Sequence, residues 1–404
     1  MIRLGDIADV FDGPHATPKK IETGPVYLGL DSINERGEII PEGFNFLSEE
    51  DYIKWTKRVT PRKDDIIFSY EASLYRYCII PDNFKCCLGR RVAVVRVKDK
   101  RINPKWLFYY FLSKEWNLFL SNNLLKGSTV NRISVDKYPD YSIPEVDLTI
   151  QNKIVSVLDK YTNLIEENKN FYSNAMEYVE KLFELVFIKK DYSSIGVKRE
   201  EVTYSKKTLN DLISLERGGD WGDSAPTKKN TLKVFCIRGA DFPSVCGTIE
   251  PDFQTRYISD KNDYKKLQDG DLVIEVSGNP GRIIFINKNT LKRFDNNVIS
   301  SNFCVAIALK NKEYSYWLYL MWKNLYKAGL CKNYTGKTTI GNLLYNALSE
   351  QYEFDVPDSK TVEAFNKRVA AIFERMQFNL AQNDLLFEAR NKLLNVIIHG
   401  KNLK

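Results

Sequence analysis

The chain contains an internal repeat, and this duplication limits its fold more than any other feature. A glycine, then a small or basic residue, then a threonine begin one segment at Gly127 and a second at Gly336. Each segment passes a β-branched residue just before Pro144 or Pro357 and then continues as a long helical pattern. Matching segments lie about 205 to 214 residues apart, which is too long for a solenoid repeat and predicts a duplicated domain.

Two further pairs of segments repeat in the same order. Residues 4–10 (LGDIADV) and 209–215 (LNDLISL) each run into a glycine turn, and 64–69 (DDIIFS) resembles 270–275 (GDLVIE). A chain of 404 residues commonly holds two to three domains. The repeat therefore predicts a pseudo-dimer within one polypeptide, which would present two similar surfaces to a partner with two sites in series.

Each repeat has the pattern of an α+β domain. Short β-branched runs bounded by polar turns predict strands, and longer apolar stretches that follow a capping residue predict helices. The predicted strands lie at 65–70, 91–97, 272–276, 282–286 and 303–308, and the predicted helices at 103–121 and 314–328.

Between residues 148 and 190 the apolar spacing becomes that of one long helix. Seam positions from Ile154 to Val186 alternate in steps of four and three residues, which is the heptad pattern of a coiled coil. A weaker C-terminal stripe comprises Val362, Phe365, Val369, Ile372, Met376, Leu386 and Leu393. Because neither helix can bury its stripe alone, we expect the two to pack as an antiparallel coiled coil. Asn168, Asn379 and Asn383 would set its register, or would face solvent where a stripe rotates.

These patterns divide the chain into five parts. The predicted parts are a first α+β domain (1–148), a long spacer helix (149–190), a polar linker (191–206), a second α+β domain (207–358) and a second long spacer helix (359–404).

Composition argues against a membrane, a disulfide framework and a metal site. No apolar run approaches the roughly 20 residues of a membrane span, and the N-terminus lacks the apolar stretch of a signal peptide. The seven cysteines include no CxxC pair, which indicates free thiols and a cytoplasmic location. With only two histidines, His15 and His399, we expect neither a zinc site nor a bound cofactor.

The motifs that resemble catalytic sites lack an essential part. Gly336-Lys-Thr resembles the end of a phosphate-binding loop, but Cys331 stands where that loop needs glycine. Asp140, Glu167 and Lys169 match a nuclease pattern by letter, yet the last two fall on a helix, where residues i and i+2 face apart. We therefore expect a binding protein and not an enzyme.

Basic, planar and hydroxyl side chains outside the strand patterns indicate a surface for nucleic acid. Residues 1–51 hold four basic and eleven acidic side chains, whereas 52–137 hold eighteen basic and seven acidic ones. This asymmetry predicts a basic face, unless the two stretches interleave in space. Arginine pairs with guanine, asparagine with adenine, and lysine and hydroxyl groups reach phosphates. The candidate DNA-binding residues are Tyr70, Tyr75, Arg76, Arg90, Arg91, Lys126, Ser128, Thr129, Asn131, Arg132, Arg217, Trp221, Asn279, Arg282, Asn296, Asn297, Lys337 and Thr338.

In this doubled order the chain resembles the specificity subunits of type I restriction-modification enzymes. The resemblance rests on the leucine-x-aspartate start before a glycine turn, the central strand, the glycine-x-threonine segment and the proline before each long helix. The chain departs from the family where each helix begins, since the family often has a second proline and a glutamine there. Glu145 and Asp358 stand after the two prolines instead, and only the first repeat keeps its glutamine, Gln151.

The resemblance implies two target-recognition domains, each reading one half of a bipartite sequence in double-stranded DNA. The two long helices would hold the half-sites a fixed distance apart and dock two methyltransferase (modification) subunits, with restriction or translocase subunits as further partners. Those partner chains would bind S-adenosylmethionine and ATP. Two alternatives stay open: a coiled-coil scaffold that does not bind DNA, and a nuclease or methyltransferase with an unrecognised site.

Overall fold

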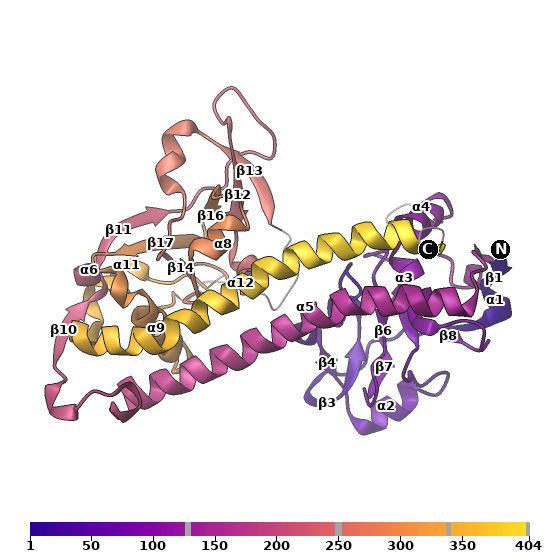
Figure 1. The fold of residues 1–404 in the computed structure, drawn as a ribbon, viewed down its shortest axis with the longest axis horizontal. Coiled ribbons are helices and arrows are strands. Elements are labelled where there is room, and N and C mark those ends of the chain that lie inside the picture. Colours follow the sequence, from indigo (N-terminus) through magenta and orange to yellow (C-terminus); the bar gives the residue numbers. More distant parts are fainter. Residues whose placement is uncertain (126–130, 247–252, 337–340, 401–404) are drawn as a thin grey trace. The chain divides into compact units, whose positions relative to one another are not determined.

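The computed structural model describes residues 1–125, 131–246, 253–336 and 341–400, and the chain divides into two compact units. Unit 1 comprises Met1–Leu164 and Leu386–Lys404, and unit 2 comprises Ile165–Leu385. Each unit therefore contains one α+β domain and a part of both long helices (Figure 1). The predicted α+β fold with two long helices is confirmed.

Unit 1 contains two sheets and a short strand pair. The four-stranded sheet is antiparallel, with the order β2-β8-β5-β6. The three-stranded sheet has the order β4-β3-β7, in which β3 is antiparallel to β4 and parallel to β7, and β1 pairs with β9. The strands are β1 (Ile2–Arg3), β2 (Ala8–Asp12), β3 (Ile21–Leu28), β4 (Asn45–Phe46), β5 (Ile66–Ser69), β6 (Tyr77–Ile79), β7 (Cys86–Leu88), β8 (Val92–Val97) and β9 (Ser142–Ile143).

Unit 2 repeats this topology strand for strand. Its four-stranded sheet has the order β11-β17-β14-β15, its three-stranded sheet the order β13-β12-β16, and β10 pairs with β18. Here too one neighbour of the central strand β12 is antiparallel and the other is parallel. The strands are β10 (Tyr204–Thr208), β11 (Ile213–Gly218), β12 (Leu232–Ile237), β13 (Gln254–Ile258), β14 (Leu272–Glu275), β15 (Ile283–Phe285), β16 (Val298–Ser300), β17 (Cys304–Leu309) and β18 (Glu353–Pro357).

The predicted helix at 103–121 is two helices. Asn103 caps the first, with its side-chain oxygen 2.9 Å from the amide of Lys105. The break falls at Ser113, whose hydroxyl accepts from the amide of Trp116 (3.2 Å) and so begins the second helix. The helix predicted at 314–328 is confirmed as α9. The shorter helices are α1 (Leu4–Ile7), α2 (Glu49–Trp55), α3 (Pro104–Leu112), α4 (Lys114–Asn122), α6 (Leu209–Leu212), α7 (Phe242–Val245), α8 (Lys288–Lys292), α9 (Ser315–Lys327), α10 (Leu330–Asn333) and α11 (Tyr345–Gln351).

One inner strand of each four-stranded sheet, β5 or β14, is apolar on both faces because each face meets a different core. In unit 1, Ile66 and Phe68 of β5 join the core that contains α3 and the long helices, whereas Ile67 joins the core that contains β3 and β7. In unit 2, Leu272 and Val273 of β14 divide in the same way. This alternation explains why both strands read as continuous apolar runs in the sequence.

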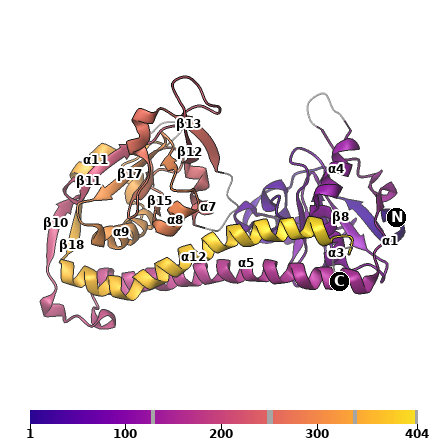
Figure 2. The same cartoon turned by 45° about the horizontal axis from the view of Figure 1, so that its top comes forward.

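The long helices are α5 (Leu148–Phe183), which continues into a π-helical turn (Glu184–Ile188), and α12 (Ser359–Ile397). In unit 2, the side chain of Asn168 donates to that of Asn383 (2.8 Å), and the ring centroids of Phe183 and Phe365 lie 6.0 Å apart. In unit 1, Arg390 donates to the hydroxyl of Thr162 (3.2 Å). The two helices therefore run antiparallel within each unit, as predicted (Figure 2).

The seam of α12 differs from the predicted stripe beyond Met376. Leu386 and Leu393 are only partly buried. The buried positions there are Gln377, Asn379, Leu380, Asn383, Phe387, Arg390, Leu394, Ile397 and Ile398. Because polar residues occupy several of these positions, hydrophobic spacing alone misses them. The alternative that Asn168, Asn379 and Asn383 face solvent is wrong, since all three are buried.

Candidate nucleic-acid interface

In unit 1, several candidate residues meet where β5 ends and β8 begins. The amide of Tyr70 donates to the carbonyl of Arg91 (3.1 Å), and the amide of Ile133 donates to the carbonyl of Tyr70 (2.8 Å). Arg132 forms a β-bridge with Glu71, whose carboxylate lies 3.0 Å from Nε of Arg91. We call Tyr70, Glu71, Arg91 and Arg132 the first sheet-end site.

The same backbone arrangement recurs in unit 2. The amide of Val276 donates to the carbonyl of Phe303 (2.8 Å), and the amide of Leu343 donates to the carbonyl of Val276 (2.7 Å). Ser277 forms a β-bridge with Asn342. We call Val276, Ser277, Phe303 and Asn342 the second sheet-end site. These residues occupy the places of Tyr70, Glu71, Arg91 and Arg132, respectively.

This equivalence identifies two residues that sequence reasoning missed. Phe303 is 56% exposed although it is a large apolar residue, and Asn342 is exposed as well. Asn342 lies 210 positions after Arg132, whereas Gly336 lies only 209 after Gly127. An alignment anchored on the two glycines therefore misses Asn342 by one residue, and the structural register is needed to find it.

Arg76 and Arg282 are equivalent residues that brace the fold. Nη1 of Arg76 donates to the carbonyl of Leu30 (2.9 Å), and Nη2 of Arg282 donates to that of Gly239 (2.6 Å). Both carbonyls belong to 3₁₀ turns that follow the central strand of the three-stranded sheet. These guanidinium groups connect the two sheets of each unit, so their main role is internal.

Arg217 is removed from the candidate set by burial. Its side chain is 1% exposed and forms an ion pair with Asp271. Burial raises the pKa of Asp271, although Arg217 beside it acts in the opposite direction. In unit 1 the corresponding aspartate, Asp65, is also paired with an arginine, Arg96 of β8, through two hydrogen bonds of 2.8 and 2.6 Å. Arg217 is therefore an internal partner of the strand-initial aspartate.

Asn296 and Asn297 lie in the turn between α8 and β16 and not at the second sheet-end site. Asn296 has a left-handed backbone (φ 59°), which asparagine tolerates better than most residues. The side chain of Asn297 donates to the carbonyl of Asp295 (3.1 Å), and its own carbonyl accepts from the amide of Phe235 (2.8 Å). Both asparagines therefore have a local role in shaping this turn.

The two tyrosines are largely internal. Tyr70 is only 6% exposed, and burial together with the nearby Asp12 carboxylate raises its pKa well above the ordinary value. Tyr75 packs against the core of unit 1 and has a left-handed backbone (φ 65°). Neither ring presents an open face comparable to that of Phe303.

The candidates that remain accessible are fewer than predicted. Arg90, Asn131 and Arg132 are exposed in unit 1, as is Asn279 in unit 2, and Trp221 is 36% exposed. Within the described residues, the guanidinium groups of Arg90 and Arg132 form no ion pair. The candidates Lys126, Ser128, Thr129, Lys337 and Thr338 lie outside the described residues.

The basic stretch of unit 1 is partly neutralised by the acidic stretch that precedes it. Lys85 contacts Glu49 (2.6 Å), and Lys98 contacts Asp9 (2.8 Å). The two stretches therefore interleave at these points, and the positive charge open to a partner is smaller than the sequence count suggests.

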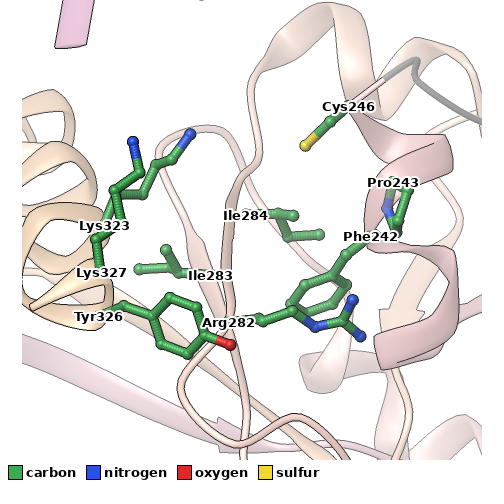
Figure 3. A pocket seen from close by; sticks show the side chains of 9 residues that line it. All are labelled: Phe242, Pro243, Cys246, Arg282, Ile283, Ile284, Lys323, Tyr326 and Lys327. Atoms are coloured by element: carbon green, nitrogen blue, oxygen red, sulfur yellow. The ribbon is translucent and has the colours of Figure 1, made fainter. Parts of the chain in front are cut away.

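A cavity of about 310 Å³ lies between α7, β15 and α9 in unit 2 (Figure 3). Its basic side chains already have acidic partners. Arg282 contacts Glu275 (2.7 Å), and Lys323 and Lys327 both contact Glu180 (2.6 and 2.5 Å). The cavity is therefore an apolar hollow rimmed by satisfied ion pairs, which gives it little attraction for an anion.

The described part of the chain has neither a metal-ion cluster nor a membrane-spanning helix. Across residues 1–125, 131–246, 253–336 and 341–400, no group of three or more histidine, cysteine, aspartate or glutamate side chains could hold a metal ion. Over the same ranges, no helix combines the length and apolar character needed to cross a bilayer.

Comparison with known proteins gives a consistent family. A profile described as the type I restriction modification DNA specificity domain matches residues 1–172. A putative type I restriction enzyme specificity subunit of Haemophilus influenzae is 24% identical over 80% of this chain and 80% of its own. A type I restriction enzyme specificity subunit of Methanocaldococcus jannaschii is 22% identical over 99% of this chain and 92% of its own.

A solved structure shares the fold. The crystal structure of the S subunit of a type I restriction-modification system from M. genitalium covers 98% of this chain, and 94% of that chain is covered, with a TM-score of 0.50 at 14% identity. The duplicated topology and the two long helices agree with these matches. The chain is thus similar to the specificity subunits of type I restriction-modification systems, through a profile match over residues 1–172, two relatives that cover most of the chain, and a shared fold.

Proposed function

We propose that this chain reads a bipartite DNA target, with one half-site bound at each sheet-end site, and that it has no catalytic role of its own. The observation that carries the proposal is that one backbone arrangement is built twice with different side chains. Glu71, Arg91 and Arg132 stand at the first site, and unit 2 has other residue types at each equivalent place. Equal scaffolds with unequal side chains suit two half-sites of different sequence.

The exposed side chains have the chemistry of base recognition. Arg132 can donate two hydrogen bonds to guanine, and Asn342 can pair in the same way with adenine. Phe303 offers an apolar surface to the methyl group of thymine. Because the backbone beside Arg132 and Asn342 is fixed by bridges to the neighbouring strand end, their side chains start from defined positions.

We further propose that the long helices recruit two methyltransferase subunits. In unit 2, α5 exposes Phe171 and Tyr178 (40% and 54% exposed), which are seven residues apart. On α12, Phe378 and Leu385 are also seven apart and are 48% and 68% exposed. Heptad-spaced apolar residues on outer helix faces favour the docking of a further helix. Restriction or translocase subunits would then join through the same assembly.

The recognition proposal is tested by exchanging residues 1–148 for the corresponding domain of another specificity subunit. The methylated motif of a strain that expresses the hybrid with its methyltransferase partner is then determined across the genome. We expect one half of the motif to change and the other half to stay. If both halves changed together, or if the wild-type complex bound no duplex at any salt concentration, the proposal would be wrong.

The recruitment proposal is tested separately. Phe171→Glu combined with Leu385→Glu should abolish copurification with a coexpressed methyltransferase subunit, because charges would replace the apolar contacts. Lys181→Ala serves as the control, since Lys181 lies on the same helix, is 71% exposed and pairs with Glu177 one turn away. Equal recovery of the methyltransferase with both variants would contradict the proposed docking surface.

A further inference from the structure

Arg256 and Trp221 form a stacked pair at the edge of unit 2. The guanidinium carbon of Arg256 lies 3.7 Å from the centroid of the Trp221 ring. Among the described residues, Arg256 has no ion pair, and its Nε is buried without a hydrogen-bond acceptor. Two other arginines of this unit are paired in contrast, Arg217 with Asp271 and Arg293 with Asp384. The two terminal nitrogens of Arg256 thus stay available to an outside partner.

The loop that carries Trp221 is held firmly in place. The amide of Gly219 donates to the carbonyl of Cys304 (3.3 Å), and that of Asp220 donates to the carbonyl of Ser300 (2.9 Å). Asp223 and Tyr257 exchange two backbone hydrogen bonds of 2.9 Å each. The bond between Gly219 and Cys304 joins this loop to the residue that follows Phe303 of the second sheet-end site.

Arg256 is fixed from the other side of the pair. It lies on β13, where its backbone pairs with Val234 of the central strand β12. An arginine stacked on an aromatic ring has its guanidinium plane oriented before binding, so less entropy is lost when both of its terminal nitrogens bond one partner. The pair is therefore prepared for a planar, two-acceptor ligand and not merely for a point charge.

Nearby acids do not compete strongly for this guanidinium. The carboxylate of Asp220 accepts from the side chain of Asn262 (2.6 Å) and lies 3.4 Å from Nζ of Lys265. That of Asp223 accepts from Thr227 (3.1 Å) and Asn230 (2.9 Å). Because these acceptors are satisfied within the loop, the donors of Arg256 stay available to DNA.

We propose that Arg256 reads a guanine, through its O6 and N7 atoms, in the half-site bound by unit 2, with Trp221 as the positioning residue. This inference rests on the proposed function. Guanine O6 and N7 are the acceptor pair that an arginine fork fits in the major groove. A phosphate could also accept both hydrogen bonds of the arginine, but lysine binds phosphates as well. Arg256→Lys should therefore weaken binding to guanine more than binding to a phosphate.

The test uses the full chain in complex with its methyltransferase subunits and a duplex that contains the motif methylated by the wild type. Arg256→Lys keeps the charge but removes the planar fork. We expect affinity for the motif to fall about 10- to 100-fold, with tolerance of any base at one guanine position. Affinity for a non-specific duplex and its salt dependence should stay unchanged. Lys229→Ala is the matched control, because it removes one exposed charge from the loop that follows Trp221.

A duplex with 7-deazaguanine at that position supplies a second readout, because it lacks the N7 acceptor. The wild type should bind this duplex less tightly than the guanine duplex. Arg256→Lys already lacks the fork that contacts N7, so it should bind the two duplexes with nearly equal affinity. The affinity of Trp221→Ala for the guanine duplex should lie between those of the wild type and Arg256→Lys. Trp221→Phe should keep most of the specificity for guanine.

Three results would overturn the inference while leaving the proposed function intact. The first is that Arg256→Lys loses the same affinity for specific and non-specific duplexes. The second is that Arg256→Lys recognises the same motif as the wild type. The third is that the half-site bound by unit 2 contains no position selective for guanine. Thermal unfolding of each variant separates these outcomes from misfolding. Absence of any specific binding by the wild-type complex would overturn the proposed function together with this inference.

Discussion

Arginine side chains serve several different purposes in this protein, and their surroundings decide which. Arg76 and Arg282 bond backbone carbonyls and connect sheets. Arg217 neutralises a buried aspartate. Arg132 and Arg256 have no carboxylate partner within the described residues. This last group offers unused donors to a ligand, whereas a guanidinium already paired in the interior would have to give up those bonds first.

Arg217→Ala is predicted to destabilise unit 2. The substitution leaves the Asp271 carboxylate buried without its charged partner, which costs about 3–5 kcal/mol. Urea unfolding followed by tryptophan fluorescence measures the loss. Arg132→Ala, which removes an exposed arginine, should change the free energy of unfolding by less than about 0.5 kcal/mol.

The double variant Arg217→Met with Asp271→Leu tests whether the unpaired Asp271 carboxylate causes this loss of stability. It removes both charges and keeps similar volume, so its stability should approach that of the wild type. If Arg217→Ala instead lost DNA affinity at unchanged stability, Arg217 would be a DNA contact and its assignment as the internal partner of Asp271 would be wrong.

The site could be predicted from the sequence only as a pool of suitable residue types. Composition identified Arg132 and Trp221, which remain accessible, but it could not separate them from Arg76, Arg217 and Arg282. That distinction depends on which carboxylates and carbonyls fold next to each guanidinium. Phe303 was missed because a phenylalanine at the start of a strand normally predicts a core residue.

At the scale of the elements, polar residues occupy the seam between α5 and α12. The side chain of Asn168 donates to Asn383 (2.8 Å) and Gln382 (3.0 Å), and Asn383 donates to the carbonyl of Ile165 (3.2 Å). In the other unit, Arg390 takes a seam position and bonds the carbonyl of Arg36 (3.1 Å). Such groups favour one register, since any slip would leave buried donors without acceptors.

Asn168→Leu should therefore destabilise the helix pair by about 1–3 kcal/mol, because the Asn383 side chain loses its donor in a buried seam. Asn168→Leu combined with Asn383→Leu should regain that stability and raise the melting temperature, at the expense of a defined register. Calorimetry of the two variants measures both effects. Asn163→Leu, an exposed change on the same helix, is the control. A double variant no more stable than the single would argue against the seam role.

Glu180 of α5 contacts Lys323 (2.6 Å) and Lys327 (2.5 Å) of α9. Burial raises the pKa of Glu180, but the two lysines outweigh it and hold the pKa below the ordinary value of 4.5. A carboxyl with a lowered folded pKa stabilises the fold above its unfolded pKa, and this contribution is lost as the pH falls through the folded value.

Glu180→Gln should accordingly lower the free energy of unfolding by about 2 kcal/mol at pH 7. The gap between variant and wild type should shrink as the pH falls below about 4.5. Urea unfolding of both proteins at several pH values measures this difference in the free energy of unfolding. Glu177→Gln, which affects only the exposed pair with Lys181, should cost about 0.5 kcal/mol or less. A gap independent of pH would contradict the ion-pair explanation.

At the scale of the whole molecule, the duplication was readable from the sequence because glycines, prolines and strand patterns recur in fixed order. Both four-stranded sheets have the predicted central strand, and the two long helices pair as expected. The sequence could not show the second, three-stranded sheet in each unit, since short edge strands such as β4 carry too few residues for a pattern. It also missed the break at Ser113, where a hydroxyl interrupts an otherwise continuous apolar stretch.

The duplication leads to a prediction about the length of the DNA target. We propose that α5 and α12 set the gap between the two half-sites. Seven residues inserted after Leu164 and a matching seven after Leu385, the limits of the compact units, should keep the seam in phase. Seven helical residues add about 10 Å, close to three base pairs of duplex.

The methylated motif of the doubly inserted protein should therefore gain about three base pairs between unchanged half-sites. Three base pairs also rotate the duplex by about 100°, so affinity should fall even when the longer gap is selected. An insertion in α5 alone should instead lower the melting temperature, because its partner helix keeps the old length. Genome-wide mapping of methylated sites gives the gap directly. An unchanged gap in a folded, doubly inserted protein would mean that the helices do not set the spacing.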